Sequence, residues 1–176
     1  MQDRLFIFVE GDDDELFFSK VVKPILKTNC IIIKYAQKRK IADYALNIKK
    51  MKADYLFVGD IDLKACVTAK KQNISHLYKL DEDKIIIVIK EIESWYLAGL
   101  DESRAKRFGI PIVRDTQKID KETFEREFIP KQFKNKIDFL NEHESLLNRN
   151  GQTKKLIFSI FCRKIPAIIK GHYQSV

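Results

Sequence analysis

Histidine and cysteine are scarce in this chain, and their scarcity limits the kinds of functional site that it can hold. The 176 residues include only three histidines, which lie far apart, so a histidine-based active site has no support. The three cysteines, Cys30, Cys66 and Cys162, are isolated and do not follow metal-site spacings. We therefore expect buried free thiols in a protein of the reducing cytoplasm.

Long apolar segments are also missing. No apolar run is long enough to span a membrane, and the sequence starts directly into an apolar strand without a signal-peptide pattern. No repeat, low-complexity tract or flexible linker divides the chain. With 176 residues and many aliphatic and aromatic side chains, it is long enough for one domain with a sizeable core. These features predict a cytoplasmic globular protein without membrane contact.

Positive charge is in excess, and the excess lies mostly late in the chain. Residues 1–100 carry 17 Lys and Arg against 15 Asp and Glu, whereas residues 101–176 carry 16 against 10. An acidic cluster early and a basic surface late suit a metal site beside a polyanion track. From the charge alone, a solvated lysine-rich surface is the better explanation.

Short apolar runs alternate with helical patterns over the first hundred residues. The predicted strands are residues 6–9, 30–35, 54–58 and 85–89. The first predicted helix begins at residues 12–14 and has its apolar face over residues 16–25. The other predicted helices are residues 41–51, 63–72 and 94–100, with a connector over residues 73–83. Strands that are apolar throughout and alternate with helices predict a central four-stranded parallel sheet with helices on both faces, an α/β fold.

The alternating pattern ends near residue 100. Beyond it we expect a short extended piece at residues 109–113, a short helix at 124–128, and longer helices at 133–147 and 153–164. The predicted organisation is therefore a catalytic core over residues 1–100 and a mostly helical extension over residues 101–176, packed as a cap on the same domain.

The first strand runs directly into acidic residues. Glu10 falls at its carboxyl end, where ligands bind in open α/β sheets. Gly11 would let the backbone turn sharply and approach a ligand closely. The next residues, Asp12 to Asp14, fall where a helix should begin, so helix capping explains them without any ligand. It does not explain Glu10.

Two later strands also end in acids. Asp60 and Asp62 follow the third strand, and Glu91 and Glu93 follow the fourth. The carboxyl ends of parallel strands share one edge, so these side chains converge with Glu10 if the first strand lies beside the third and the third beside the fourth. Convergent carboxylates suit Mg²⁺ or Mn²⁺, and two such ions can clamp a phosphodiester. Helix capping can explain either Asp60 or Asp62 taken alone, but it does not explain why three strands end in acids.

These motifs resemble a known family. Residues 9–14 (VEGDDD), followed at a later strand end by Asp60-x-Asp62, resemble the Toprim domain of type IA topoisomerases, primases, recombination proteins and OLD-type nucleases. Residues 90–98 (KEIESWYLA) are similar to a stretch in small stand-alone Toprim-like proteins of bacteria, many of them linked to phage defence. The resemblance covers about residues 4–100. Position 14 is Asp where OLD-like relatives often carry Glu, and residues 101–176 match no family pattern.

The resemblance implies a Rossmannoid three-layer fold and a Mg²⁺- or Mn²⁺-dependent nuclease acting on DNA or RNA. It makes Glu10 a metal ligand and general base, and it makes Asp60 and Asp62 metal ligands. Asp14 would hold a second metal or a water. ATPase, zinc-ribbon and helicase parts are missing from the sequence, so the resemblance fits a lone nuclease better than a topoisomerase or a primase.

Other residues near the acids have competing interpretations. Glu91 and Glu93 are further candidate ligands; Glu91 is favoured, and an exposed helix residue is the alternative for Glu93. Lys64 and Lys90 could stabilise charge on a reacting phosphate, or they are salt-bridge or surface lysines. Trp95 could stack a base, but packing is favoured. Late basic residues could contact phosphates or form a solvated helix face: Lys154, Lys155, Arg163 and Lys164.

Three other functions compete with a nuclease. A catalytically silent Toprim-like subunit would bind nucleic acid or an ATPase partner. A receiver-like phosphoacceptor domain would need Ser or Thr after the fourth strand and Lys after a fifth, whereas the fourth strand here leads into Lys90 and Glu91. A haloacid-dehalogenase-like phosphatase would carry Asp60-x-Asp62 on its first strand, and here the pair follows the third.

Overall fold

A four-stranded, all-parallel sheet lies at the centre of the protein. The computed structural model describes residues 4–26, 29–36, 40–62, 66–98, 100, 102–134 and 136–147. The sheet has the strand order β2-β1-β3-β4. Its strands are β1 (Arg4–Val9), β2 (Asn29–Lys34), β3 (Asp54–Asp60) and β4 (Ile85–Val88). The predicted neighbours, first strand beside third and third beside fourth, are confirmed.

Buried apolar residues hold these strands in register. Ile7 pairs with Leu56 and Phe8 with Phe57 across β1 and β3, and all four side chains are fully buried. The third strand runs two residues further than predicted and ends at Asp60. Its pairing with β4 reaches Asp60 opposite Val88. The carboxylate of Asp60 therefore belongs to the sheet edge itself and not to the loop after it.

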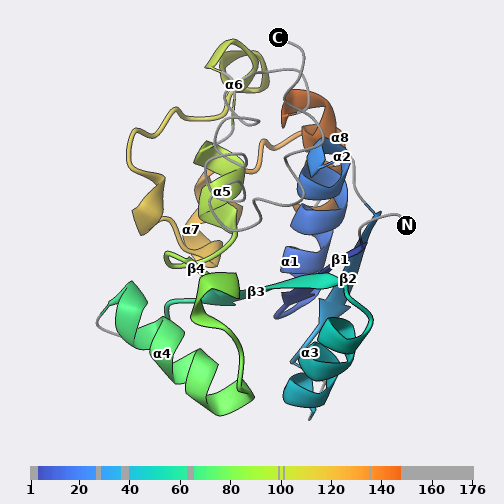
Figure 1. Ribbon diagram of the computed structural model, residues 1–176. Helices are drawn as coiled ribbons and strands as arrows, with labels where there is room; N and C mark the ends of the chain where they lie inside the picture. The colour runs from blue at the N-terminus through green and yellow to red at the C-terminus, as the bar shows by residue number, and fades with distance from the viewer. Residues whose placement is uncertain are drawn as a thin grey trace, which may run out of the picture.

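Helices cover both faces of the sheet, which gives three layers (Figure 1). One face carries α3 (Ile41–Lys50) and α4 (Val67–Tyr78). The other face carries α1 (Asp12–Phe17), a π-helical turn (Phe18–Val22), α2 (Lys23–Leu26) and α5 (Glu93–Ala98). Three further helices lie on the α1 side of the sheet, namely α6 (Glu102–Phe108), α7 (Lys121–Glu127) and α8 (Lys136–Leu147).

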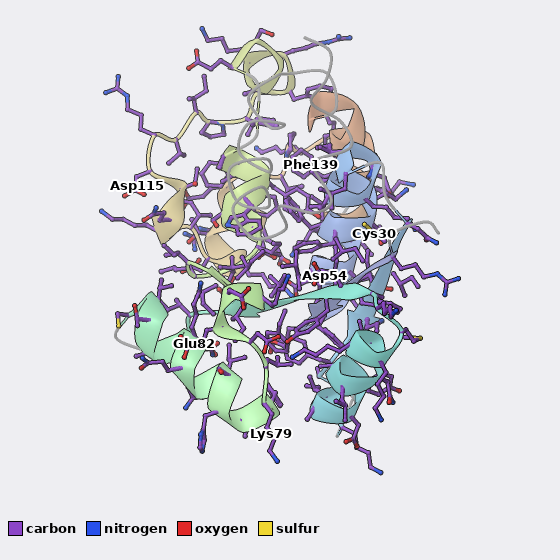
Figure 2. All side chains as sticks on the ribbon, viewed as in Figure 1. Cys30, Asp54, Lys79, Glu82, Asp115 and Phe139 are labelled. Carbon is purple, nitrogen blue, oxygen red and sulfur yellow. The ribbon has the colours of Figure 1, made fainter. Side chains whose placement is uncertain are left out.

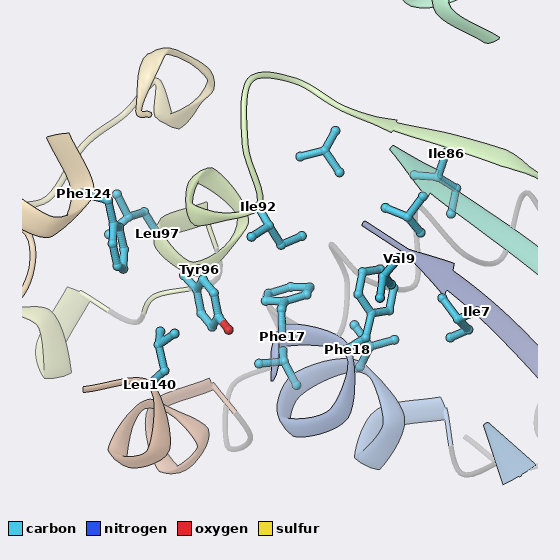
Figure 3. Packing of buried hydrophobic residues seen from close by; sticks show 14 of the residues in the cluster. Ile7, Val9, Phe17, Phe18, Ile86, Ile92, Tyr96, Leu97, Phe124 and Leu140 are labelled. Carbon is cyan, nitrogen blue, oxygen red and sulfur yellow. The ribbon is translucent and has the colours of Figure 1, made fainter. Parts of the chain in front are cut away.

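Residues beyond position 100 share the apolar core on the α1 side. Phe124 of α7 and Phe139 of α8 are fully buried and belong to the same cluster as Val9 and Phe17. The rings of Phe17 and Tyr96 meet edge to face with 4.8 Å between centroids (Figure 3). Figure 2 places Phe139 in this layer, across the sheet from the end of α4. Burial of these aromatic rings ties α7 and α8 to the sheet.

Two helices differ from the prediction, and one of them is α6, where no helix was predicted. The helix predicted over residues 63–72 is α4, which begins at Val67 and continues to Tyr78, so the connector predicted over residues 73–83 is wrong for its first half. The helix persists because Ile74 is buried against the core on the α3 side, and it ends where Lys79 takes a left-handed conformation. Residues 110–113 form neither helix nor strand. The helix predicted over residues 153–164, with its candidate phosphate contacts, lies outside the described residues.

The described cysteines are free thiols in different environments. Cys30 is buried in the core on the α1 side, and burial raises its pKa to about 11. Cys66 is exposed. It is the N-cap residue of α4, and its sulfur accepts a hydrogen bond from the backbone N–H of Ala69. The expectation of buried thiols is therefore wrong for Cys66. Cys162 lies outside the described residues.

Trp95 is partly buried and packs against the core, as the favoured interpretation predicted. Its ring meets Phe17 edge to face with 5.8 Å between centroids. Among the described helices, none is long and apolar enough to cross a membrane.

Candidate metal centre

The sheet has one point where the winding of the chain reverses, and it lies between β1 and β3. From β1 the chain moves outward to β2, then returns past β1 to build β3 and β4. In doubly wound sheets the crevice at this switch point, at the carboxyl ends of the strands, is where ligands bind. Glu10 directly follows β1 and Asp60 ends β3, so both acids flank this crevice.

Tyr35 connects the two sides of the switch point. It directly follows β2, and its hydroxyl donates a hydrogen bond to Glu10 Oε2 at 3.2 Å. Its ring stacks on Phe57 of β3, with 4.5 Å between centroids. A Cβ on Gly59 would lie 3.4 Å from the Tyr35 hydroxyl, so this glycine leaves room for the phenol. Tyr35 was not among the predicted site residues, although its position at the end of the predicted strand over residues 30–35 was a usable signal.

The raised pKa of Asp60 indicates that other acids lie close to it. Burial and, to a smaller extent, the neighbouring negative charges together raise the pKa of Asp60 to about 8. Those charges belong to Asp14, Glu10, Asp62 and Glu91. Four of the other predicted ligands are thus near enough to act on one carboxyl group. Burial and the carboxylate of Glu10 also raise the pKa of Tyr35, so its hydroxyl stays a proton donor at neutral pH.

Asp14 approaches from the first turn of α1. Its Oδ2 accepts a hydrogen bond of 3.0 Å from the backbone N–H of Gly11. The pKa of Asp14 is nevertheless raised, because the effect of burial outweighs that of this hydrogen bond. The negative charges of Glu10 and Glu93 raise it further. The side chain is therefore anchored at one oxygen and lies within the field of the other acids.

The start of α1 corrects two expectations. The N-cap is Gly11 and not an aspartate, and Asp14 instead reaches back to cap the N-cap backbone. Gly11 has φ −135° and ψ −163°, an extended conformation open to any residue. An added Cβ would meet nothing within 4 Å. The expected sharp turn at Gly11 is therefore wrong, and the fold itself does not require glycine there.

The acids farther from the switch point are held by other groups. Asp62 forms an ion pair with Lys70 of α4. Glu91 accepts a hydrogen bond from the backbone N–H of Lys121, although burial still raises its pKa. Asp62 has φ 48°, a left-handed conformation two residues past the end of β3. Such strain in a non-glycine residue is often found at functional sites.

Glu93 is buried, so the alternative of an exposed helix residue is wrong. It is 2 % exposed and binds Lys136 at the start of α8. Lys136 also pairs with Asp13 at 3.0 Å, and Lys121 reaches Asp13 at the same distance. These two lysines from beyond residue 100 compensate the negative charge on this flank, and together they lower the pKa of Asp13 against the effect of its burial.

Of the two lysines that were candidates for stabilising charge on a reacting phosphate, the structure describes only Lys90. Lys90 is about half exposed and lies 3.5 Å from Asp120, which agrees with a salt-bridge lysine at the surface. Its φ of 58° places another left-handed residue after a strand of this edge, here β4. Lys64 lies outside the described residues.

Glu10, Asp14 and Asp60 form the uncompensated part of the cluster, and we refer to them as the open acids. Within the described ranges, none of the three forms an ion pair with Lys or Arg, whereas Asp13, Asp62 and Glu93 do. As the side chains stand, the described residues hold no group of three His, Cys, Asp or Glu that could bind a metal ion. The donors are hard carboxylate oxygens, which suit Mg²⁺ or Mn²⁺, and their unbalanced charge favours a cation.

Comparison of the chain with protein-family models, curated proteins and solved structures found no match in any of the three. The fold and the site therefore define the class. It is a Rossmann-like three-layer α/β protein with acidic side chains at the switch point of a parallel sheet.

Proposed function

We propose that this protein is a stand-alone Toprim-type nuclease of the OLD kind, which uses Mg²⁺ or Mn²⁺ to hydrolyse phosphodiester bonds in DNA or RNA. One observation carries the proposal. The open acids gather at the switch point without a described cationic partner, while Asp13, Asp62 and Glu93 nearby are paired with lysines. Crowded carboxylates cost free energy, and a bound divalent cation recovers it.

The residues divide the work as follows. Glu10 and Asp60 would hold the metal, with Asp14 beside them and Asp62 once it leaves Lys70. A bound metal would polarise the phosphodiester and lower the pKa of an attacking water. Tyr35 orients Glu10 through one carboxylate oxygen. The other oxygen has no hydrogen bond within the described part of the chain, so Glu10 can accept a proton as general base.

Two of the competing functions find no support in the site. A receiver-like domain needs a hydroxyl residue after β4, but Ile89, Lys90 and Glu91 follow it, and the described sheet has four strands. A haloacid-dehalogenase-like phosphatase would use Asp62 as a free acid on the first strand. Here Asp62 follows β3 and is paired with Lys70.

The proposal is tested by incubating the protein with plasmid DNA and, separately, with total RNA. The expected result is cleavage of at least one substrate with Mg²⁺ or Mn²⁺, and none with EDTA. Cleavage that persists in EDTA would overturn the metal requirement. Binding of nucleic acid without cleavage would instead favour a silent subunit, which could need an ATPase partner.

The pKa of Asp60 gives a second test through stability. Its ordinary value is 3.8 and its folded value is about 8. Well below pH 3.8 both states are protonated, and ionisation of Asp60 then makes no difference to stability. As the pH rises toward 8 the unfolded chain ionises first, so stability is lost progressively, by on the order of 5 kcal/mol for the full shift. Asp60→Asn cannot ionise and should gain Tm over wild type increasingly between pH 4 and 8.

Divalent metal should reduce the difference in Tm between wild type and Asp60→Asn at pH 8. Millimolar Mg²⁺ or Mn²⁺ is expected to raise the Tm of wild type and to leave that of Asp60→Asn unchanged, because the variant loses a ligand. Asp83→Asn, the same change at an exposed acid, is the matched control and should respond as wild type does. A wild-type Tm indifferent to metal would contradict the metal site.

A further inference from the structure

A second concave surface adjoins the open acids. It is a pocket of about 580 Å³ between the first turn of α1, the segment joining α7 to α8, and the start of α8. Ile129, Phe133 and Ile137 form an apolar wall, and Lys131 and Lys134 stand at its rim. Pockets of this size and mixed character hold ligands of nucleotide dimensions.

Three lysines and two acids line the pocket, and both acids, Asp13 and Glu125, pair with Lys136. Lys136, at its base, is compensated by Asp13 and Glu93. Lys131 and Lys134 are exposed, and within the described ranges neither forms an ion pair. Two ammonium groups with no ion-pair partner among the described residues, beside an apolar wall, suit a ligand that carries both a phosphate and a flat apolar ring.

The pocket and the acidic edge share a wall. Asp13, which lines the pocket, is the residue before Asp14, one of the open acids. Lys136 binds Asp13 on one side and Glu93 on the other, so it stands between the two surfaces. A strand with one phosphodiester at the open acids would therefore have a neighbouring nucleotide at this pocket.

We propose that this pocket binds a nucleotide of a single-stranded segment next to the bond that is cleaved. Lys131 and Lys134 hold its phosphate, and the base lies against Ile137 and Phe133. This assignment rests on the proposed nuclease function, because it takes the neighbouring acids as the reaction site. It adds that the substrate presents an unpaired base, which a continuous duplex does not offer.

Binding of a fluorescein-labelled single strand, measured by anisotropy in EDTA, tests the pocket without cleavage. Lys131→Glu/Lys134→Glu is expected to bind about tenfold or more weakly at 0.1 M salt, with a salt slope reduced by about two. Lys50→Glu/Lys52→Glu, an equal charge change at exposed residues of the opposite layer, should stay within about twofold of wild type. Ile137→Ser should weaken binding without changing the salt slope, because the lost contact is apolar.

The same variants separate this proposal from the nuclease itself. Equal weakening by the two double variants, or none by the first, would overturn the pocket, as would a wild type that binds duplex as tightly as single strand. If the pocket variant cleaves like wild type, the pocket fails and the nuclease stands. If wild type binds through the pocket but never cleaves with metal, the nuclease fails and the pocket stands.

Discussion

Replacing Glu10 with glutamine is expected to slow metal-dependent cleavage by about a thousandfold or more while leaving nucleic-acid binding intact or slightly tighter. Glutamine keeps the shape of the side chain and can still accept the hydrogen bond from Tyr35, which is 3.2 Å long in the native protein. It removes only the negative charge that the metal and the proton transfer require. Affinity comes from lysine and arginine, so it should weaken steeply with salt in both proteins.

Single-turnover cleavage and anisotropy, at identical salt and Mn²⁺, measure the two effects separately. Glu82→Gln makes the same change at an exposed residue of the 3₁₀ turn before β4 and should cleave like wild type. Because metal ligands act as a unit, Glu10→Gln/Asp60→Asn should be little slower than either single variant. Equal cleavage by wild type and Glu10→Gln would remove the catalytic role of Glu10.

Replacing Lys136 with methionine is expected to destabilise the fold by about 3–5 kcal/mol, because it leaves a buried carboxylate without its partner. The Lys136 side chain is 10 % exposed and that of Glu93 is 3 % exposed. Methionine fills similar space, so the loss reports the charge and not a cavity. Lys136→Met/Glu93→Leu removes both charges and should recover most of the stability, as measured by urea unfolding.

Lys121→Met provides a matched control for this prediction. Lys121 also lies 3.0 Å from Asp13, but its side chain is 48 % exposed. A solvent-exposed pair contributes little, so this variant should lose no more than about 1 kcal/mol. If both lysine variants lost the same stability, or if the double variant were as unstable as Lys136→Met, the buried pair would not be the cause.

The sheet and its neighbours could be predicted because their signals are local. Apolar runs of strand length alternate with helical spacing, and acids such as Glu10 and Asp60 fall at the run ends. Parallel strands place those ends on one edge of the sheet, and the convergence of the acids depended in addition on the strand order, which the local pattern does not determine. The extra length of α4 was missed because only Ile74 and the partly buried Tyr78 mark its packed side there, and two residues are too few to define a period.

The partners of the acids could not be predicted, because they depend on packing between distant segments. Lys136 lies 43 positions from Glu93, and only the docking of α8 on α5 and α1 brings them together. Tyr35 reaches Glu10 because the strand order puts β2 beside β1. The sequence shows how many acids lie at the strand ends, but it does not show which of them are paired with lysines and which are not.

The lysines that α7 and α8 supply have a consequence for electroneutrality at the sheet edge. A chain cut after residue 100 would keep every strand-end carboxylate and lose Lys121 and Lys136, the cations that balance Asp13 and Glu93. The cut edge would then attract cations at positions that the whole protein keeps closed. The helices after residue 100 thus leave Glu10, Asp14 and Asp60, beside the crevice between β1 and β3, as acids without a described lysine partner, and under the proposed function this is where the metal ion would bind.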